Sequence, residues 1–225
     1  MKGPMIKIED LAFGYGEEFS LTVPALEVDT GERVACIGPS GTGKTTLINL
    51  MTGILRPDRG LVLLDGKDIG AMGEDARRQA RIQTVGMVFQ QFELLEYLNA
   101  LENILLPYHL NPALTLDAAA QSRARSIAEH MGITRILKRK PANLSQGERQ
   151  RVAISRALVT EPALLIADEP TGNLDPENSN TILDLLFAQC DERGATLLVV
   201  THDHDLLPRF DRIIDMMALP QGAAQ

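Results

Sequence analysis

The stretch Gly38-Pro-Ser-Gly-Thr-Gly-Lys-Thr-Thr46 decides more about this chain than any other part of it. It fits the pattern G-x-x-x-x-G-K-[ST], in which glycines let the backbone bend tightly and turn several N–H groups toward one point. We expect Arg33–Ile37 before it to form a buried strand, and Thr45–Leu55 after it to form a helix with one apolar face. A strand, a glycine-rich loop and a helix N-terminus in this order predict an anion cradle for the phosphates of a nucleoside triphosphate.

Two residues of this loop carry distinct expected roles. Lys44 is expected to reach the β- and γ-phosphates, and the hydroxyl of Thr45 to ligate Mg²⁺. The alternative is a glycine-rich turn before an ordinary core helix, which gives no reason for the lysine and threonine at these places. The rest of the predicted ATP-binding loop consists of Gly38, Pro39, Ser40, Gly41, Thr42, Gly43 and Thr46.

Composition and charge restrict the function further. The chain has 225 residues, 44% of them hydrophobic, so it can bury a sizeable core as one large domain or as a core with an inserted lobe. Its formal net charge of −8 argues against binding nucleic acid, which requires a basic stripe that neutralises phosphates. The basic clusters Arg77–Arg81 and Lys138–Lys140 are interpreted as solvated helix faces. The two cysteines, Cys36 and Cys190, are interpreted as reduced, buried thiols of a cytosolic protein.

Strand and helix patterns predict an α/β fold with a helical insertion. Residues 5–13 and 19–28 are expected to pair as an antiparallel edge, and short apolar runs predict strands at 33–37, 61–64, 85–89, 163–167 and 196–200. Residues 91–160 are mostly helical in pattern, and a further helix is expected at 176–190. We therefore expect one domain over residues 1–225, with a nucleotide-binding core of about 1–90 and 160–225 and a helical subdomain of about 91–159. No stretch approaches the roughly 20 apolar residues of a membrane-spanning helix.

Two carboxylates follow the strand expected at 163–167. Asp168 and Glu169 lie at the carboxyl end of that strand, where ligands bind in α/β sheets. Asp168 is expected to hold Mg²⁺ directly or through water, and Glu169 to orient and deprotonate an attacking water. An ordinary solvated loop would explain an Asp-Glu pair on its own, but a complete phosphate loop in the same chain favours the catalytic interpretation.

A third pattern begins the helix that is expected after Leu144. Ser145 and Glu148 have the spacing of a capping box, in which each side chain binds a backbone N–H of the other residue. This pattern has two interpretations. It is either a well-capped helix only, or a second helix N-terminus that offers the Ser145 hydroxyl and the Gly147 amide to an anion.

Taken together and in this order, four segments resemble the motifs of the ATP-binding-cassette (ABC) ATPases: the phosphate loop, Leu144–Glu148, Asp168–Asp175 and Thr201–Asp203. The resemblance covers essentially the whole chain. It implies a P-loop NTPase core, a mixed sheet with flanking helices and an antiparallel β edge, with an inserted α-helical subdomain. It also implies ATP and Mg²⁺ as ligands and an ATP-dependent, head-to-tail homodimer. In such a dimer each ATP lies between the phosphate loop of one subunit and the signature helix of the other.

The resemblance also implies roles for single residues. Tyr15 is similar to the aromatic residue that stacks on adenine, and Gln90 to the glutamine that touches Mg²⁺ and water. Glu169 resembles the catalytic base, Asp175 the residue that links the subunits, and His202 the switch at the γ-phosphate. The signature that would meet the partner's ATP consists of Leu144, Ser145, Gln146, Gly147 and Glu148.

One signature residue departs from the family pattern. Gln146 stands where the family usually has glycine, and glutamine cannot adopt a positive φ as cheaply as glycine. The resemblance alone therefore leaves open how closely this signature approaches the γ-phosphate.

Within the family, the chain is similar to stand-alone subunits for lipoprotein release, macrolide export and cell division. This similarity rests on the segments Phe89–Leu95, Ala100–Ile104 and Asp168–Asp175. It implies a cytoplasmic ATPase, peripheral on the cytoplasmic face of the inner (plasma) membrane, that drives a separate permease as an exporter or as a mechanical transmission. The alternatives are a regulatory ATPase that signals through a membrane partner without transport, and a soluble ABC protein. The permease is expected to dock near Gln90, on an apolar cluster made of Phe92, Leu94, Leu95, Tyr97 and Leu98. The alternative for any single member of this cluster is core packing within the helical subdomain.

Overall fold

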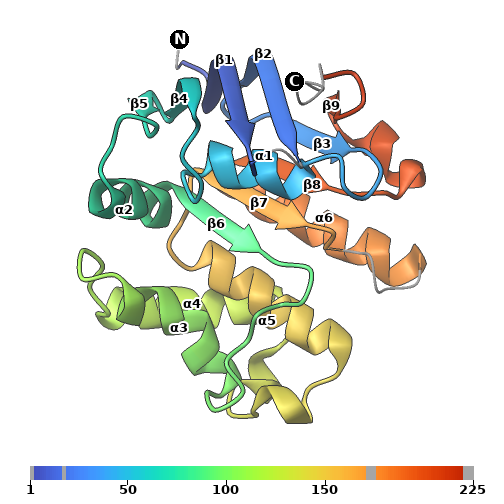
Figure 1. The fold of residues 1–225 in the computed structure, drawn as a ribbon. Helices are drawn as coiled ribbons and strands as arrows, with labels where there is room; N and C mark the ends of the chain where they lie inside the picture. Colours follow the sequence, from blue (N-terminus) through green and yellow to red (C-terminus); the bar gives the residue numbers. More distant parts are fainter. Residues whose placement is uncertain (1–2, 17–18, 171–175, 220–225) are drawn as a thin grey trace.

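Two β-sheets organise the chain, shown as a computed structural model in Figure 1, which describes residues 3–16, 19–170 and 176–219. The first sheet is antiparallel, with the order β2-β1-β4-β5; its strands are β1 (Ile6–Gly14), β2 (Ser20–Val28), β4 (Arg59–Leu64) and β5 (Lys67–Asp68). The second is parallel, with the order β6-β7-β8-β3-β9; its strands are β3 (Arg33–Ile37), β6 (Val85–Val88), β7 (Leu164–Asp168), β8 (Thr196–Val200) and β9 (Arg212–Asp215).

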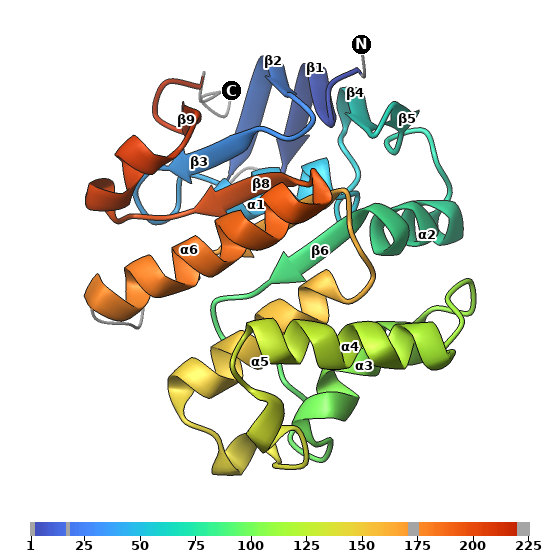
Figure 2. The same ribbon diagram turned by 180° about the vertical axis from the view of Figure 1, so that it is seen from behind.

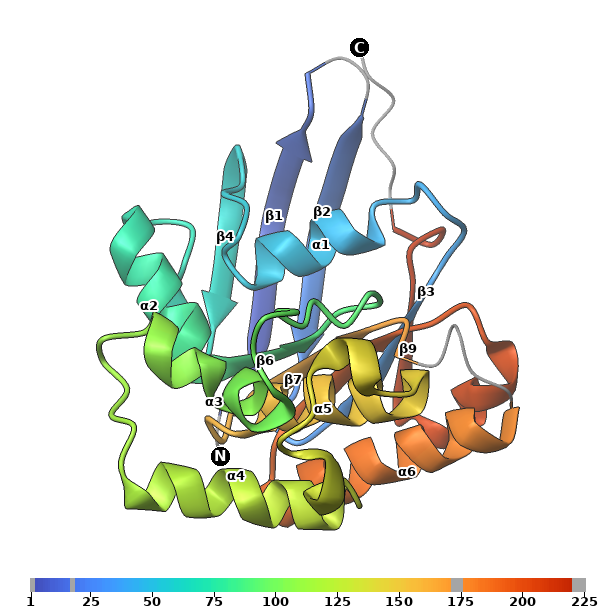
Figure 3. The ribbon, with the colours of Figure 1, turned by 90° about the horizontal axis from the view of Figure 1, so that it is seen from below.

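Helices cover both faces of the parallel sheet. The α-helices are α1 (Lys44–Met51), α2 (Glu74–Thr84), α3 (Ala100–Leu110), α4 (Ala118–His130), α5 (Gln146–Leu158) and α6 (Pro176–Arg193). Short 3-10 turns occur at η1 (Thr134–Ile136), η2 (Pro141–Asn143) and η3 (His204–Arg209). Helix α1 lies between the two sheets, and α6 runs across the opposite face of the parallel sheet (Figure 2). Helices α3 and α4 gather beside α5, on the side away from the antiparallel sheet (Figure 3).

The parallel strands separate two hydrophobic cores. Leu164 and Ile166 of β7 pack in the core between the sheets, whereas Leu165 and Ala167 of the same strand pack in the core that contains α5 and α6. This division follows from the two-residue period of a strand, and it explains why β7 and β8 are apolar at every position except Asp168 at the end of β7 and Thr196 at the start of β8. Cys36 and Cys190 are both buried, as predicted, and burial raises the pKa of each thiol to about 12.

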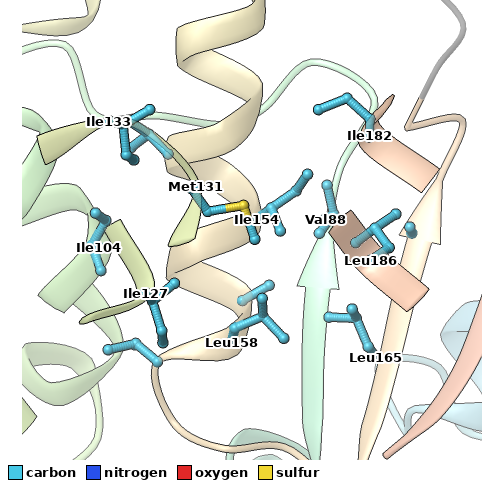
Figure 4. Packing of buried hydrophobic residues seen from close by; sticks show 14 of the residues in the cluster. Val88, Ile104, Ile127, Met131, Ile133, Ile154, Leu158, Leu165, Ile182 and Leu186 are labelled. Atoms are coloured by element: carbon cyan, nitrogen blue, oxygen red, sulfur yellow. The ribbon is translucent and has the colours of Figure 1, made fainter. Parts of the chain in front are cut away.

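Helix α5 joins the helical layer to the sheet. Figure 4 shows Ile154 and Leu158 of α5 between two groups of side chains. On one side lie Ile104, Ile127 and Met131 from α3 and α4 or directly after them, and on the other lie Val88, Leu165 and Leu186 from the sheet and α6. All of these residues are almost completely buried, so α5 cannot move relative to either group without disturbing the packing of both.

The fold confirms the predicted α/β class, and it also corrects several details. Helix α1 ends at Met51 and not at Leu55, because Gly53 adopts a left-handed φ of +68° and the hydroxyl of Thr52 donates to the carbonyl of Ile48. Lys138, Arg139 and Lys140 are exposed, but they lie between η1 and η2 and not on a helix face. The expected strands and the expected helix 176–190 are present with small shifts at their ends, whereas the tail 220–225 lies outside the described residues.

Helix α2 contains the cluster Arg77–Arg81, which was expected on a solvated helix face, but its bounds were not predicted because its sequence is strongly polar. Its arginines are also not the solvated residues that were expected. Arg77 is buried, with its stem over Gly53, and its guanidinium lies 2.7 Å from a carboxylate oxygen of Glu74. Arg81 donates to the carbonyl of Gly53 at 3.0 Å, and only Arg78 is exposed. The aliphatic stems of arginine can cover backbone in this way while the charged end reaches a polar partner.

In the part of the chain that the structure describes, no helix combines the length and the apolar character needed to cross a bilayer.

The close approach of β6 and α5 gives a stability prediction. A Cβ added at Gly86 would lie 2.2 Å from the carbonyl oxygen of Ala157, and neither backbone can retreat without moving a core element. We expect Gly86→Ala to lower the free energy of unfolding by about 3 kcal/mol, the upper range for overpacking. Urea unfolding measures this loss. Gly73→Ala is the control, because its Cβ meets nothing within 4 Å, and it should cost less than about 1 kcal/mol. Equal losses in the two variants would contradict the steric explanation.

Candidate active site

A cavity of about 500 Å³ opens at the carboxyl ends of the parallel strands. It collects segments that are far apart in the sequence: the loop after β3, the residue that follows β6 by two positions, and the carboxylates at the end of β7. The residues that line it are Tyr15, Phe19, Ser40, Gly41, Gly43, Lys44, Thr45, Thr46, Gln90, Asp168 and Glu169. Ten of these eleven were expected from the sequence, and Phe19 was not.

The phosphate loop has the backbone geometry that its glycines make possible. Gly41 and Gly43 adopt φ values of +85° and +90°, in the left-handed region that favours glycine. A Cβ at Gly43 would also lie 2.7 Å from the ring of Phe19, so two independent constraints exclude a side chain there. The Nζ of Lys44 donates to the carbonyls of Gly38 and Pro39, at 2.6 and 2.9 Å, which places the ammonium group over the loop.

Asp168 and Glu169 form a pair of neighbouring carboxylates that are both partly buried. Burial raises the pKa of Asp168, the negative charge of Glu169 raises it further, and Lys44 acts in the opposite direction. Glu169 adopts a left-handed φ of +47°, and its N–H still donates to the carbonyl of Val200 at 2.9 Å. The turn after β7 is therefore held to β8 in a conformation that is unfavourable for a glutamate, as is common at functional sites.

Two side chains from neighbouring strands contact the carboxylate of Glu169. The amide Nε2 of Gln90, which follows β6, donates to one carboxylate oxygen at 2.9 Å. The Nδ1 of His202, which follows β8, lies 3.4 Å from the other oxygen. Gln90 and His202 thus approach Glu169 from two sides, and the three residues lie together because β7 is placed between β6 and β8 in the sheet.

An aromatic group borders the phosphate loop. The side chain of Tyr15 is half exposed, and its ring makes an edge contact with Phe13 and a tilted contact with Phe19, with centroid distances of 4.9 and 5.8 Å. An exposed ring that is fixed by two neighbours can stack on a purine with little loss of freedom. Phe19 could not be assigned to the site from the sequence, because an aromatic residue before a strand is typical of the core.

The signature residues do not line this cavity. The capping box of α5 is formed: the N–H of Ser145 donates to the carboxylate of Glu148 at 2.7 Å, and the N–H of Glu148 donates to the Ser145 hydroxyl. Leu144 is buried, whereas Ser145 and Gln146 are exposed, and a Cβ at Gly147 would meet nothing within 4 Å. The helix N-terminus therefore points into open space. Asp175, the other residue expected at a subunit contact, lies outside the described residues.

The departure at Gln146 introduces no backbone strain. Gln146 is the first residue of α5 and is absent from the non-glycine residues with positive φ in the described chain. The concern that glutamine would need a conformation that favours glycine is therefore wrong for this structure, because a helical first turn suits most residues.

Helix α5 also contributes a buried contact that the sequence did not reveal. Gln150 is almost completely buried, and its amide donates to the carbonyl of Pro170, directly after Glu169. Within the described residues its side-chain oxygen has no partner. No signal in the sequence distinguishes this glutamine from a surface residue of an amphipathic helix.

The residues expected to bind Mg²⁺ have suitable chemistry and lie in one place. Thr45, Gln90 and Asp168 all line the cavity, and each offers an oxygen atom, the ligand type that Mg²⁺ prefers. Burial and then the neighbouring charge of Glu169 raise the pKa of Asp168, and a divalent cation beside these carboxylates would stabilise their ionised forms. The donor set and the electrostatics therefore fit this ion.

Comparison with known proteins identifies the class. The sequence model of the ABC transporter family matches residues 21–172. The chain belongs to this family and is an ATP-binding ATPase subunit of the ABC type. This confirms the family, the fold class and the ATPase activity that the motifs predicted.

Individual relatives cover most of the chain. Over 189 residues it is 44% identical to the lipoprotein-releasing system ATP-binding protein LolD 2 of Caulobacter vibrioides, which is 84% of this chain and 82% of that protein. Over 208 residues it is 44% identical to YbbA of Escherichia coli K12, an uncharacterized ABC transporter ATP-binding protein, with coverage of 91% and 90%. Among solved structures it is similar to the cassette MJ0796, a dimer in a post-hydrolysis state with ADP and Pi. The TM-score is 0.81, the identity is 33%, and 94% of each chain is covered.

The raised pKa of Asp168 predicts a conflict between stability and function. Because the folded state raises this pKa, the ionised carboxylate destabilises the fold above that pKa, and the penalty disappears as the pH falls and the group is protonated. Asp168→Asn cannot ionise, so it should raise the midpoint of thermal unfolding at neutral pH in the absence of nucleotide and metal. The gain should shrink at acidic pH. The same variant should hydrolyse ATP much more slowly.

Thermal unfolding of both proteins across this pH range measures the effect. Asp75→Asn, at an exposed carboxylate of α2, is the control and should show no gain that depends on pH in this way. A lower unfolding midpoint for Asp168→Asn than for the wild type at neutral pH would contradict the electrostatic explanation.

Proposed function

We propose that the protein binds and hydrolyses Mg²⁺-ATP as a head-to-tail homodimer, and that it drives a separate permease of the lipoprotein-release type. One observation carries the proposal. The cavity brings together a phosphate loop, two carboxylates and Gln90, whereas the signature residues at the N-terminus of α5 in the same chain do not line that cavity. Each chain thus holds two anion-binding elements that do not meet, and a second copy supplies the missing half.

The residues of the cavity have separate roles in ATP binding and hydrolysis. Lys44 and the loop N–H groups bind the β- and γ-phosphates, and Tyr15 stacks on the adenine. Glu169 accepts a proton from the attacking water, and Gln90 orients that water through its contact with the same carboxylate. His202 lies on the opposite side of Glu169 and senses the γ-phosphate.

A magnesium ion would be held by three residues of the same cavity: Thr45, Gln90 and Asp168. When bound, this ion supplies positive charge that stabilises the developing negative charge on the phosphate oxygens. Asp168 must be ionised for this role, so its partly buried position next to Glu169 favours loading with a cation.

In the proposed dimer, α5 presents its N-terminus to the partner's ATP. Four features support this: the Ser145 hydroxyl is exposed, Gly147 has free space around it, Gln146 is unstrained, and the helix end carries a partial positive charge. The similar cassette MJ0796 is a dimer with ADP and Pi, which is consistent with this arrangement.

The permease is proposed to dock in a groove between α2, β6, α3 and α5. This groove has a volume of about 350 Å³. Its walls are mostly apolar, and Leu110 and Phe89 are 65% and 37% exposed. Arg81, Glu93 and Arg156 are the charged residues of its lining. A mostly apolar groove with charged residues in its lining fits an amphipathic helix of a membrane partner, so the protein is proposed to work on the cytoplasmic face of the membrane.

The proposed groove differs from the docking surface expected from the sequence. None of Phe92, Leu94, Leu95, Tyr97 and Leu98 lines it. Leu94 packs against the hydrophobic core, and the loop around Leu95 is held by the buried side chain of Asn103, which bonds to backbone groups of Leu95, Leu98 and Asn99. Leu94 therefore packs against the core, and of the expected cluster Tyr97 alone is highly exposed, at 69%.

Replacing the proposed base tests hydrolysis and dimerisation together. Glu169→Gln keeps the shape and the hydrogen bond to Gln90 but removes the proton acceptor. Turnover should fall by about 10²–10⁴-fold, as is typical when a general base is lost. ATP binding should persist, and an ATP-bound dimer should accumulate. Phosphate release measures the first effect, and size-exclusion chromatography with light scattering in ATP measures the second.

Lys44→Ala is the contrasting variant, because it should lower ATP affinity as well as turnover and should leave the protein monomeric. Wild-type turnover in Glu169→Gln would refute the assignment of the base. A slow variant that stays monomeric with saturating ATP would refute the dimer while leaving the base in place.

The groove is tested by a charge at its most exposed apolar residue. Leu110→Glu should abolish co-purification with the co-expressed permease while ATP hydrolysis of the isolated protein stays within a few-fold, because Leu110 does not line the cavity. Ile213→Glu is the matched control, since Ile213 is 45% exposed on β9, the sheet edge farthest from β6. Normal capture of the permease by Leu110→Glu would place the docking surface elsewhere.

A further inference from the structure

The loop after β6 contains two strained residues next to the proposed catalytic pair. Phe92 and Glu93 adopt φ values of +63° and +48°, the left-handed region that non-glycine residues avoid. Local backbone bonds shape this turn: the N–H of Phe92 donates to the carbonyl of Phe89, and that of Glu93 to the carbonyl of Gln91. Gln90 lies inside the turn, so the position of its side chain depends on whether the strained conformation is maintained.

One buried arginine of α5 bonds to both strained residues. The guanidinium of Arg156 donates through one nitrogen to the carbonyl of Phe92 and through the other to the carbonyl of Glu93, each at 2.5 Å. Arg156 is 8% exposed, and burial lowers its pKa. A planar fork with two parallel donors fixes the orientation of two consecutive carbonyls, which a single ammonium group cannot do.

The other arginines of this helix bond elsewhere. Arg149 donates to the carbonyls of Pro141 and Leu144, and Arg151 donates to the carbonyl of Met131, all within the helical layer. Arg156 instead reaches across to the segment that leaves the sheet after β6, and Figure 1 shows that segment beside α5. Its bonds therefore connect the signature helix to the loop that carries Gln90.

We propose that Arg156 is a positioning residue for ATP hydrolysis: it holds the Phe92–Glu93 turn and thereby places the amide of Gln90 against Glu169. This inference rests on the proposed roles of Gln90 and Glu169. The chain of contacts is continuous, from Arg156 to the two carbonyls, through the turn to Gln90, and from Gln90 to Glu169 at 2.9 Å. Arg156 does not line the cavity, so it acts on the reaction only through this loop.

The test is a double-mutant cycle of ATPase kinetics on the full-length protein. Arg156→Lys keeps the charge but can no longer bridge both carbonyls. We expect kcat to fall about ten-fold, while the KM for ATP stays within about two-fold, because the loss is one of orientation and not of nucleotide binding. In the Gln90→Ala background the same change should lower kcat by less than about two-fold, because the residue that Arg156 positions is already gone.

Arg151→Lys is the matched control, an arginine of the same helix that bonds to a backbone carbonyl in the helical layer. Its kcat and KM should stay near those of the wild type in both backgrounds. Circular dichroism and the midpoint of thermal unfolding confirm that each variant is folded. If Arg156→Lys alone does not fold, Glu93→Gly is added to every member of the cycle, since glycine adopts the left-handed conformation without strain.

The outcomes separate this inference from the function on which it rests. Wild-type turnover in Gln90→Ala would refute the proposed role of Gln90. A slow Gln90→Ala together with an undiminished, about ten-fold effect of Arg156→Lys in that background would refute the positioning role and leave Gln90 in place. A parallel rise of KM and fall of kcat, or an equal effect of Arg151→Lys, would reduce Arg156 to general stabilisation of α5.

Discussion

The placement of β7 between β6 and β8 is the constraint on which the active site depends. Parallel strands end at the same edge of a sheet, so the residues that follow them meet there without any further device. Gln90 comes after β6, Glu169 after β7 and His202 after β8, and the side chains of Gln90 and His202 both contact the carboxylate of Glu169. The phosphate loop follows β3 on the other side of β8, which puts Lys44 in the same cavity as Asp168 and Glu169. The order of strands therefore brings these residues to one edge of the sheet, and contacts within the loops then orient their side chains.

This arrangement concentrates unfavourable features at one edge of the molecule. Two neighbouring carboxylates are partly buried, which raises the pKa of Asp168, and Glu169, Phe92 and Glu93 all adopt left-handed backbone conformations. Strain of this kind persists only where the surroundings overdetermine the conformation. Here the surroundings are the hydrogen bond from Glu169 to β8 and the bonds from Arg156 to the loop after β6. The apolar cores on both faces of the parallel sheet stabilise these elements, and their stabilisation offsets the cost of the strained and partly buried groups at the site.

Helix α5 connects the parts that must act together. Its N-terminus carries Ser145 and the capping box, Gln150 in its middle bonds to the carbonyl next to Glu169, and Arg156 near its end bonds to the loop of Gln90. Its apolar side packs between the helical layer and the sheet (Figure 4). A displacement of α5 by a partner in the groove or by ATP at its N-terminus would therefore change the positions of both Gln90 and Glu169. Such a helix suits a protein that couples nucleotide state to motion in another protein.

The sequence by itself determined the parts whose chemistry is local. A tight loop that presents N–H groups requires glycine at fixed places before a helix, buried parallel strands require unbroken apolar runs, and a capping box requires Ser145 and Glu148 three residues apart. Each of these requirements involves residues that are close together in the sequence, so the sequence alone shows them, and the class of protein followed from them.

Only the tertiary structure decided the rest. In α2, the stem of Arg77 covers Gly53 and Arg81 bonds to its carbonyl, contacts that the strongly polar sequence of the helix does not predict. The contacts of Phe19, Gln150 and Arg156, and the place of the groove, join residues from distant segments. The roles of these side chains depend on the residues that pack against them. Local sequence patterns contain no information about contacts with residues that are distant in the chain.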